Sequence, residues 1–249
     1  AHLLAQTSGI HTVLGLIGGE SNEGFIKKIK TLPLNFKPGE KYEYNQINFF
    51  LLGEILSTLS QQPFDTYIEK EMFRLTKATT FDCWFTTYLG SRYSNDDRVF
   101  PSNTMITTSL ERLYDRDIAS NGLISKLNPL LDWALRLGQN EFFSPSTKAQ
   151  MWTPFNYKEE SLQSAYGWKV FPTNQSAAYG ISSPTTSVRA LPQHDITIIV
   201  LSNGYKYYPV QNEIINMVLD SMEAGLVDKN ELYFYEMSNG LITSMPYNS

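Results

Sequence analysis

The sequence predicts an α+β protein, in which helices flank an antiparallel sheet and a helical subdomain lies beside it. Three observations support this class. Apolar residues recur at helical spacing between residues 45 and 72, the period changes to that of strands from about residue 165, and helical spacing returns after residue 208. We expect one domain over residues 1–223, with a helical and loop part over about 1–160, a sheet with a closing helix over about 161–223, and a C-terminal extension over 224–249.

The first half contains the clearest helical patterns. Between residues 45 and 59 the apolar side chains repeat every three or four positions, at Phe49, Leu52, Ile55, Leu56 and Leu59. Gly53 lies within this helix and allows a close neighbour. Pro63 suits the first turn of a second helix. Residues 79–120 show no regular pattern, and an irregular stretch of this length favours a functional or capping loop region.

The second half begins with a third helix and then changes to strands. Asn128 and Pro129 form an N-cap with proline in the first helical position, and Gly138 suits the end of this helix. Residues 166–171 and 185–191 have the pattern of half-buried strands, and residues 196–201 that of a fully apolar strand. A turn at 192–195 joins the last two strands as an antiparallel hairpin, and apolar spacing over 210–222 predicts a helix that lies on the sheet.

Composition and charge exclude several classes of partner. The chain has 249 residues, and Lys+Arg 20 against Asp+Glu 25 gives a formal net charge of −5. An acidic chain is not attracted to phosphate backbones, so nucleic acid is not expected as a partner. No apolar run approaches the ~18 residues that cross a bilayer, so we expect no transmembrane segment. Cys83 is the only cysteine; we interpret it as an inert thiol, which leaves the cellular compartment open.

The sequence lacks the usual local signatures of catalytic and metal sites. No lysine has Ser or Thr three residues before it, so Ser-x-x-Lys, in which the amine takes the hydroxyl proton one helical turn away, is absent. The motifs Gly-x-Ser-x-Gly, Lys-Ser/Thr-Gly, His-x-x-x-His and Gly-x-x-x-x-Gly-Lys are absent as well. We therefore expect no metal, nucleotide or other cofactor.

Seven segments, in order, carry a resemblance to a known family. Residues 2–10 resemble a His-Leu-Leu-Thr-His-Thr-Ser-Gly segment, with Gln6 in place of the second histidine. The other matching segments lie at residues 36–53, 71–75, 121–125, 144–154, 166–168 and 188–203. On these motifs the chain resembles class C β-lactamases and the related D,D-peptidases and esterases, including animal β-lactamase-like proteins. The resemblance implies a penicillin-binding, transpeptidase-like fold and acyl-serine hydrolysis of amide, ester or β-lactam bonds.

Three elements build the active site of that family. Its Tyr-x-Asn corresponds to Tyr44-Asn45-Gln46, which keeps the proton-transfer tyrosine and has Gln46 in place of asparagine. Its edge-strand Lys-Thr-Gly or His-x-Gly corresponds to Ala178-Tyr179-Gly180, or to one residue later, so Tyr179 and Gly180 are candidate substrate-binding residues without the family's cation. Its Ser-x-x-Lys normally lies some tens of residues before the His-Leu-Leu segment, so we expect the fold to be N-terminally incomplete.

Three functional interpretations follow, and the sequence leaves substrate and oligomeric state open in each. The chain is a pseudoenzyme that binds a small acyl or peptide ligand without turnover, a fragment of an active serine hydrolase whose nucleophile lies upstream, or a non-catalytic binding or scaffold protein. Without a neighbouring cation, Tyr44 is expected to be a neutral phenol. We also expect Tyr44 to face a cleft that it shares with Tyr179 and Gly180, because the family brings these elements together.

Overall fold

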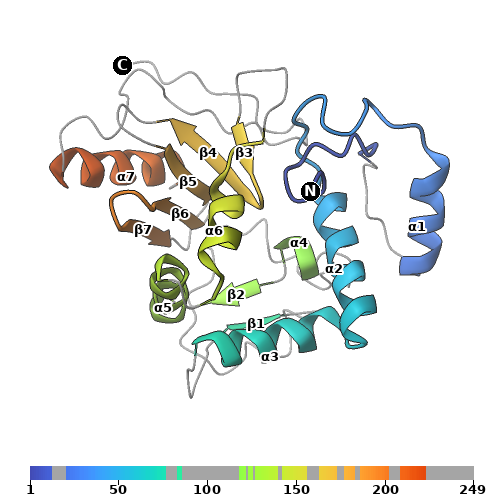
Figure 1. Ribbon diagram of the computed structural model, residues 1–249, viewed down its shortest axis with the longest axis horizontal. Coiled ribbons are helices and arrows are strands. Elements are labelled where there is room, and N and C mark those ends of the chain that lie inside the picture. Colours follow the sequence, from blue (N-terminus) through green and yellow to red (C-terminus); the bar gives the residue numbers. More distant parts are fainter. Residues whose placement is uncertain are drawn as a thin grey trace, which may run out of the picture.

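Strands from the second half of the chain form an antiparallel sheet (Figure 1). The computed structural model describes residues 1–12, 21–76, 83–85, 118–121, 123–125, 127–139, 142–155, 163–172, 177–182, 186–201 and 208–222. Within these ranges the strands are β3 (Gln163–Ala165), β4 (Trp168–Pro172), β5 (Ala177–Ser182), β6 (Thr186–Leu191) and β7 (Ile196–Leu201). Each pairs antiparallel with the next in the chain, which confirms the predicted hairpin and its antiparallel neighbours.

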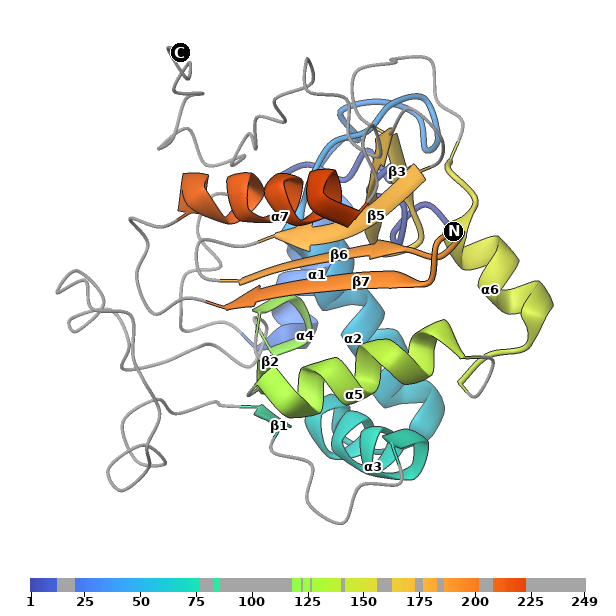
Figure 2. The same ribbon diagram turned by 90° about the vertical axis from the view of Figure 1, so that its left-hand side faces the viewer.

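Helices cover both faces of this sheet (Figure 2). Helix α7 (Tyr208–Met222) lies on one face, where Ile215 and Leu219 pack with Ala178, Leu191 and Ile198. Helices α5 (Leu127–Gly138) and α6 (Pro145–Trp152) lie on the other face, where Leu137 and Trp152 pack with Trp168, Val170, Tyr179 and Val188. The sheet is therefore the middle layer of three, and the predicted closing helix is confirmed.

The helical subdomain has its own apolar core. Helices α1 (Asn22–Thr31) and α2 (Gln46–Ser60) meet there through Phe25, Ile29, Ile47 and Phe50. Helices α3 (Phe64–Thr76) and α4 (Ile118–Asn121) lie against α2, and β1 (Cys83–Phe85) pairs with β2 (Leu123–Ser125). A Cβ atom added to Gly53 would lie 2.6 Å from the Cβ of Ala119 on α4, so the predicted close neighbour of Gly53 is α4.

The element boundaries differ from the sequence-based expectations at several points. The strand expected from residue 166 begins at Trp168, because Gly167 has a φ of +81° and forms the turn between β3 and β4. Helix α5 begins at Leu127, so Asn128 lies inside it. The expectations for residues 79–82, 86–117 and 224–249 fall outside the described residues. Among the helices that are described, none combines the length and the apolar character needed to cross a membrane.

Residues 4–7 join the helical subdomain to the sheet. The carbonyl oxygen of Ala5 accepts a hydrogen bond from Oγ of Ser164 on β3 at 2.6 Å, and that of Leu4 accepts one from the Gly167 amide at 2.9 Å. The carbonyl oxygen of Gln6 accepts a hydrogen bond from the Glu43 amide, just before α2, at 2.9 Å. This short segment therefore fixes the start of α2 relative to the β3–β4 hairpin.

Candidate functional site

Tyr44 and Gln46 lie on either side of the residue that caps α2. The side-chain oxygen of Asn45 accepts a hydrogen bond from the Ile47 amide at 3.0 Å, so Asn45 is the N-cap and Gln46 the first helical residue. Tyr44 and Gln46 are both half-buried. The cap thus holds the two candidate residues at a defined place beside the helix start.

A buried polar network fixes this cap. Oε1 of Gln6 accepts hydrogen bonds from the backbone amide of Asn45 at 3.0 Å and from Nδ2 of Asn48. Oδ1 of Asn48 accepts a hydrogen bond from Oγ of Ser8 at 2.6 Å. These four residues are 0–6% exposed, so losing one acceptor leaves a buried donor unsatisfied, which costs about 1–3 kcal/mol. Gln6, at the position of the family's second histidine, is the centre of this network.

Tyr44 is a neutral phenol near neutral pH. Burial raises its pKa above the ordinary value of 10.0, and a hydrogen bond with the Gln46 side chain acts in the opposite direction. A tyrosine that is to act as a base near neutral pH needs a neighbouring cation that lowers its pKa. Among the described residues, no cation contributes to the shift at Tyr44. This phenol is therefore suited to hydrogen bonding with a ligand rather than to taking a proton.

Tyr179 and Gly180 lie on opposite faces of the sheet. The Tyr179 ring packs on the α6 side, 4.5 Å from the Trp152 ring, and is 8% exposed. Ala178 packs on the α7 side, and the alternation of a strand places Gly180 on the same side as Ala178. Burial raises the pKa of Tyr179 as well. The Tyr179 side chain is thus a core residue, and Gly180 is the part of this pair on the α7 face.

Strand β5 is an interior strand of the described sheet, which corrects the expected edge position. It pairs with β4 on one side and with β6 on the other. Pairing with β4 ends at Gly180, so in the described sheet Ile181 and Ser182 extend beyond that neighbour. Ile181 is 48% exposed. Gly180 is buried, and Ile181 directly after it is exposed.

Two cations flank Gly180 on the neighbouring strands. Lys169 of β4 and Arg189 of β6 are both Cα partners of Gly180 in the sheet register. Their sequence neighbours Trp168 and Val188 face α5 and α6, so Lys169 and Arg189 face the α7 side. Burial and the charge of Arg189 lower the pKa of Lys169 to about 8. The strand that lacks the family's cation at position 178 thus has two cations beside it, a pair that we call the cation row.

The two halves of the candidate site are connected indirectly. Residues 4–7 bind both the start of α2 and the β3–β4 hairpin, and β4 pairs with β5. Within the described residues, no hydrogen bond or ring contact joins Tyr44 to Tyr179 or Gly180. The cleft that the three residues are expected to share stays a prediction, and Tyr179 would line it only through its backbone.

Several site residues were not indicated by sequence patterns. Of these, only Asn45 could have been found from the sequence, because an Asn directly before an apolar helix is a recognisable N-cap signal. The roles of Gln6 and Asn48 depend on a contact between positions 42 residues apart, and the cation row depends on strand register. In the described ranges, His, Cys, Asp and Glu side chains do not gather in groups of three that could hold a metal ion.

The sequence matches one family model and, over a short stretch, several known relatives. Residues 1–216 match the family model described as beta-lactamase. A putative D-alanyl-D-alanine carboxypeptidase of Escherichia coli is 32% identical over 62 residues, which cover 25% of this chain and only 14% of that relative.

Three solved structures have a similar fold. A penicillin-binding protein from Bacillus halodurans is 16% identical with a TM-score of 0.62, over 86% of this chain and 71% of that one. An octameric penicillin-binding protein homologue from Pyrococcus abyssi is 20% identical with a TM-score of 0.67, over 88% and 54%. The D-amino acid amidase from Ochrobactrum anthropi, complexed with L-phenylalanine amide, is 14% identical with a TM-score of 0.66, over 89% and 70%. Identities this low show likeness of fold alone.

Proposed function

This chain belongs to the β-lactamase family, and from this premise we propose that it is the ligand-binding part of a serine acyl hydrolase fold that forms no acyl-serine by itself. The proposed domain spans residues 1–223, with 224–249 as an extension. Its proposed site consists of Tyr44 and Gln46 at the start of α2 and of Tyr179 and Gly180 on β5. The ligand is a small acyl compound or peptide.

The observation that carries this proposal is the absence of the Ser-x-x-Lys motif from the sequence. Covalent catalysis by serine requires a base that removes the hydroxyl proton, and no Ser or Thr of the 249 residues has a lysine three residues later, as Ser-x-x-Lys requires. The remaining family base does not substitute for it, because burial raises the pKa of Tyr44 instead of lowering it. Transition-state stabilisation by the fold has no effect on a bond that is not attacked.

Binding of an acyl or peptide ligand is supported by the charges near Gly180. Lys169 and Arg189 are the two neighbours of Gly180 in the register, on the α7 side of the sheet. Hydrogen bonds from cations to a carboxylate are about twice as strong as those between neutral groups. A carboxylate on the acyl compound or peptide is therefore the chemical feature that this site is best suited to recognise.

A second candidate function is that of an active hydrolase whose Ser-x-x-Lys lies upstream of these residues. The specific observation in its favour is the length of the solved relatives, since this chain covers 71% and 54% of two of them. In that case the α2 start and β5 would contribute to a site completed by other residues. The substitution of Gln46 for asparagine would make that site unusual.

Steady-state hydrolysis separates these functions. The 249-residue chain, and a version preceded by its natural upstream sequence, are assayed with a chromogenic cephalosporin, an aryl ester and a D-Ala-D-Ala peptide. The proposal predicts no turnover by the 249-residue chain and saturable, noncovalent binding of at least one of these ligands. Turnover only by the longer version identifies the second candidate, turnover by the shorter chain refutes the proposal, and absence of binding leaves the scaffold interpretation.

A further inference from the structure

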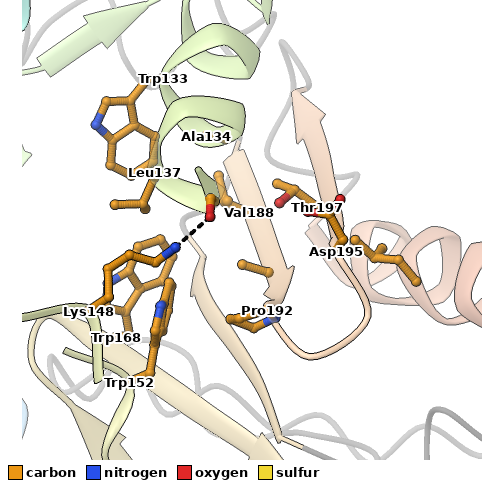
Figure 3. A pocket seen from close by; sticks show the side chains of 13 residues that line it. Trp133, Ala134, Leu137, Lys148, Trp152, Trp168, Val188, Pro192, Asp195 and Thr197 are labelled. Atoms are coloured by element: carbon orange, nitrogen blue, oxygen red, sulfur yellow. Dashed lines mark hydrogen bonds between the residues drawn. The ribbon is translucent and has the colours of Figure 1, made fainter. Parts of the chain in front are cut away.

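A pocket lies between α5, α6 and the turn that joins β6 to β7 (Figure 3). It encloses about 60 Å³ and is lined by residues that belong to neither the α2 start nor β5. A single water needs roughly 10–15 Å³ of such volume, so the pocket holds a group of about four to six heavy atoms. It lies on the α5 and α6 face of the sheet, whereas Gly180 lies on the α7 face.

One wall of the pocket is aromatic. The Trp133 and Trp168 rings stack with their centroids 6.2 Å apart and their planes 12° apart, and the Trp152 ring lies 5.0 Å from that of Trp168. These three are among the four tryptophans of the chain. Ala134 and Leu137 of α5 extend the same apolar surface. A ligand part that meets this wall is apolar.

The polar groups of the pocket are of opposite charge and lie on opposite sides. Nζ of Lys148 donates a hydrogen bond to the carbonyl oxygen of Gly138 at the end of α5, which orients the ammonium group and leaves it further N–H donors. A Cβ atom added to Gly138 would lie 3.9 Å from Oδ1 of Asp195. Figure 3 shows Lys148 and Trp152 on one side and Asp195 on the other. Both charges thus border the small space beside Gly138.

Asp195 and the Trp152 indole N–H, which both border the pocket, have no partner within the described part of the chain. The Asp195 side chain is exposed at the rim of the pocket and makes no ion pair or hydrogen bond there, and Lys148 is not within ion-pair distance of it. Nε1 of Trp152 is a buried donor without an acceptor. A buried N–H without a partner is destabilising, and an incoming acceptor would recover part of that cost. The pocket therefore has donors on one side and an acceptor on the other.

We propose that this pocket binds a small apolar α-amino acid, of about the size of alanine, as a zwitterion. The ligand carboxylate pairs with the Lys148 ammonium and accepts from the Trp152 indole N–H, the ligand ammonium pairs with the Asp195 carboxylate, and the side chain lies on the tryptophan wall. A pocket of this kind, apolar with a few convergent polar groups, is the usual form of a small-molecule site. The inference does not depend on the proposed hydrolase function, because the pocket is lined by other residues.

Calorimetric titration and tryptophan fluorescence of the full chain test this proposal. The probes are both enantiomers of alanine, with propanoate as a ligand that has only the carboxylate and ethylamine as one that has only the ammonium. At least one enantiomer of alanine is expected to bind and to change the fluorescence of the tryptophan wall. Each single-charge analogue is expected to bind about tenfold more weakly or less, because it loses one charge-assisted pairing.

Matched variants test whether Lys148 and Asp195 bind the two charged groups of the ligand. Lys148→Met and Asp195→Asn are each expected to weaken amino-acid binding about tenfold or more, whereas Lys30→Met and Glu69→Gln, which make the same changes of charge on α1 and α3, leave it unchanged. The proposal would be overturned if propanoate bound as tightly as alanine, if both pocket variants kept the parent's affinity, or if neither enantiomer of alanine bound at millimolar concentration. The ligand series decides the question in the parent chain even if a variant does not fold.

Discussion

Replacing Lys169 by methionine tests the electrostatics of the cation row. The folded protein lowers the pKa of Lys169 from 10.5 to about 8, first because the amine is removed from water and second because Arg189 is close. At about 1.4 kcal/mol for each pKa unit, full expression of this change would amount to about 3 kcal/mol. The side chain is only half-buried, and solvent screening reduces the expected contribution to about 1–2 kcal/mol.

The sign of the pH dependence follows from which state binds the proton. Below about pH 8 the lysine is protonated in both states, so the folded protein carries the full cost of the buried charge. Between pH 8 and 10.5 the unfolded chain binds more protons than the folded one, so the free energy of unfolding rises with pH. Above about pH 10 the raised pKa values of Tyr44 and Tyr179 act in the opposite direction, because there the folded state retains protons.

Urea unfolding followed by circular dichroism measures this effect. The parent is expected to gain about 1 kcal/mol or more between about pH 7 and 9.5, and Lys169→Met is expected to be about 1–2 kcal/mol more stable than the parent near neutral pH, without that gain. Lys30→Met, on the exposed side of α1, serves as the control and should keep the parent's pH profile. A Lys169→Met variant that is less stable than the parent near neutral pH, with an unchanged profile, would refute the assigned cause.

Three further changes test the structure around the site by the same unfolding assay. Gln6→Ala leaves the Asn48 amide and a backbone N–H without their acceptor and should cost about 2–4 kcal/mol; a cost below about 1 kcal/mol would contradict the buried network. Gly9→Ala should cost at least about 2 kcal/mol, because Gly9 has a φ of +71° and a Cβ there would lie 2.1 Å from the Phe36 carbonyl oxygen; equal stability would show that this close approach is absent. Phe50→Ala should cost about 3–5 kcal/mol as a core truncation, since Phe50 is 2% exposed. A loss of stability of only about 0.5 kcal/mol, as is usual for surface residues, would place Phe50 outside the core.

The elements that the sequence predicts well are those with strong apolar periodicity. Helix α2 and the β6–β7 hairpin were expected within one or two residues of their observed bounds. The buried face of α2 was predicted wrongly, because the structure buries Ile47 and Phe50, whereas Ile55 and Leu59 of the expected stripe are 46% and 77% exposed. Helix α1 was not expected, since only Phe25 and Ile29 of its ten residues are buried and lysines occupy much of the remainder. Strand β5 has small residues and a glycine in place of an alternating pattern, so its position comes from its two neighbours rather than from its own sequence.

In the candidate site, too, the residues with local sequence signals could be predicted and those placed by tertiary packing could not. Tyr44 and Gln46 could be placed because they adjoin a strongly periodic helix and a motif with local spacing. The features that decide the chemistry are non-local. The bond between Gln6 and Asn48, the opposite faces of Tyr179 and Gly180, and the cation row all depend on tertiary packing or on strand register. Register fixes which side chains share a face, and a single sequence does not specify it here.

Acylation of the intact chain tests the central claim most directly, because it detects a covalent intermediate even when turnover is slow. The 249-residue chain is incubated with a fluorescent penicillin and, separately, with a fluorophosphonate, and the intact mass is measured by mass spectrometry. The account predicts the unmodified mass in both cases, because the chain has no Ser-x-x-Lys motif. A stoichiometric adduct on a single serine, lost in Tyr44→Phe, would contradict it.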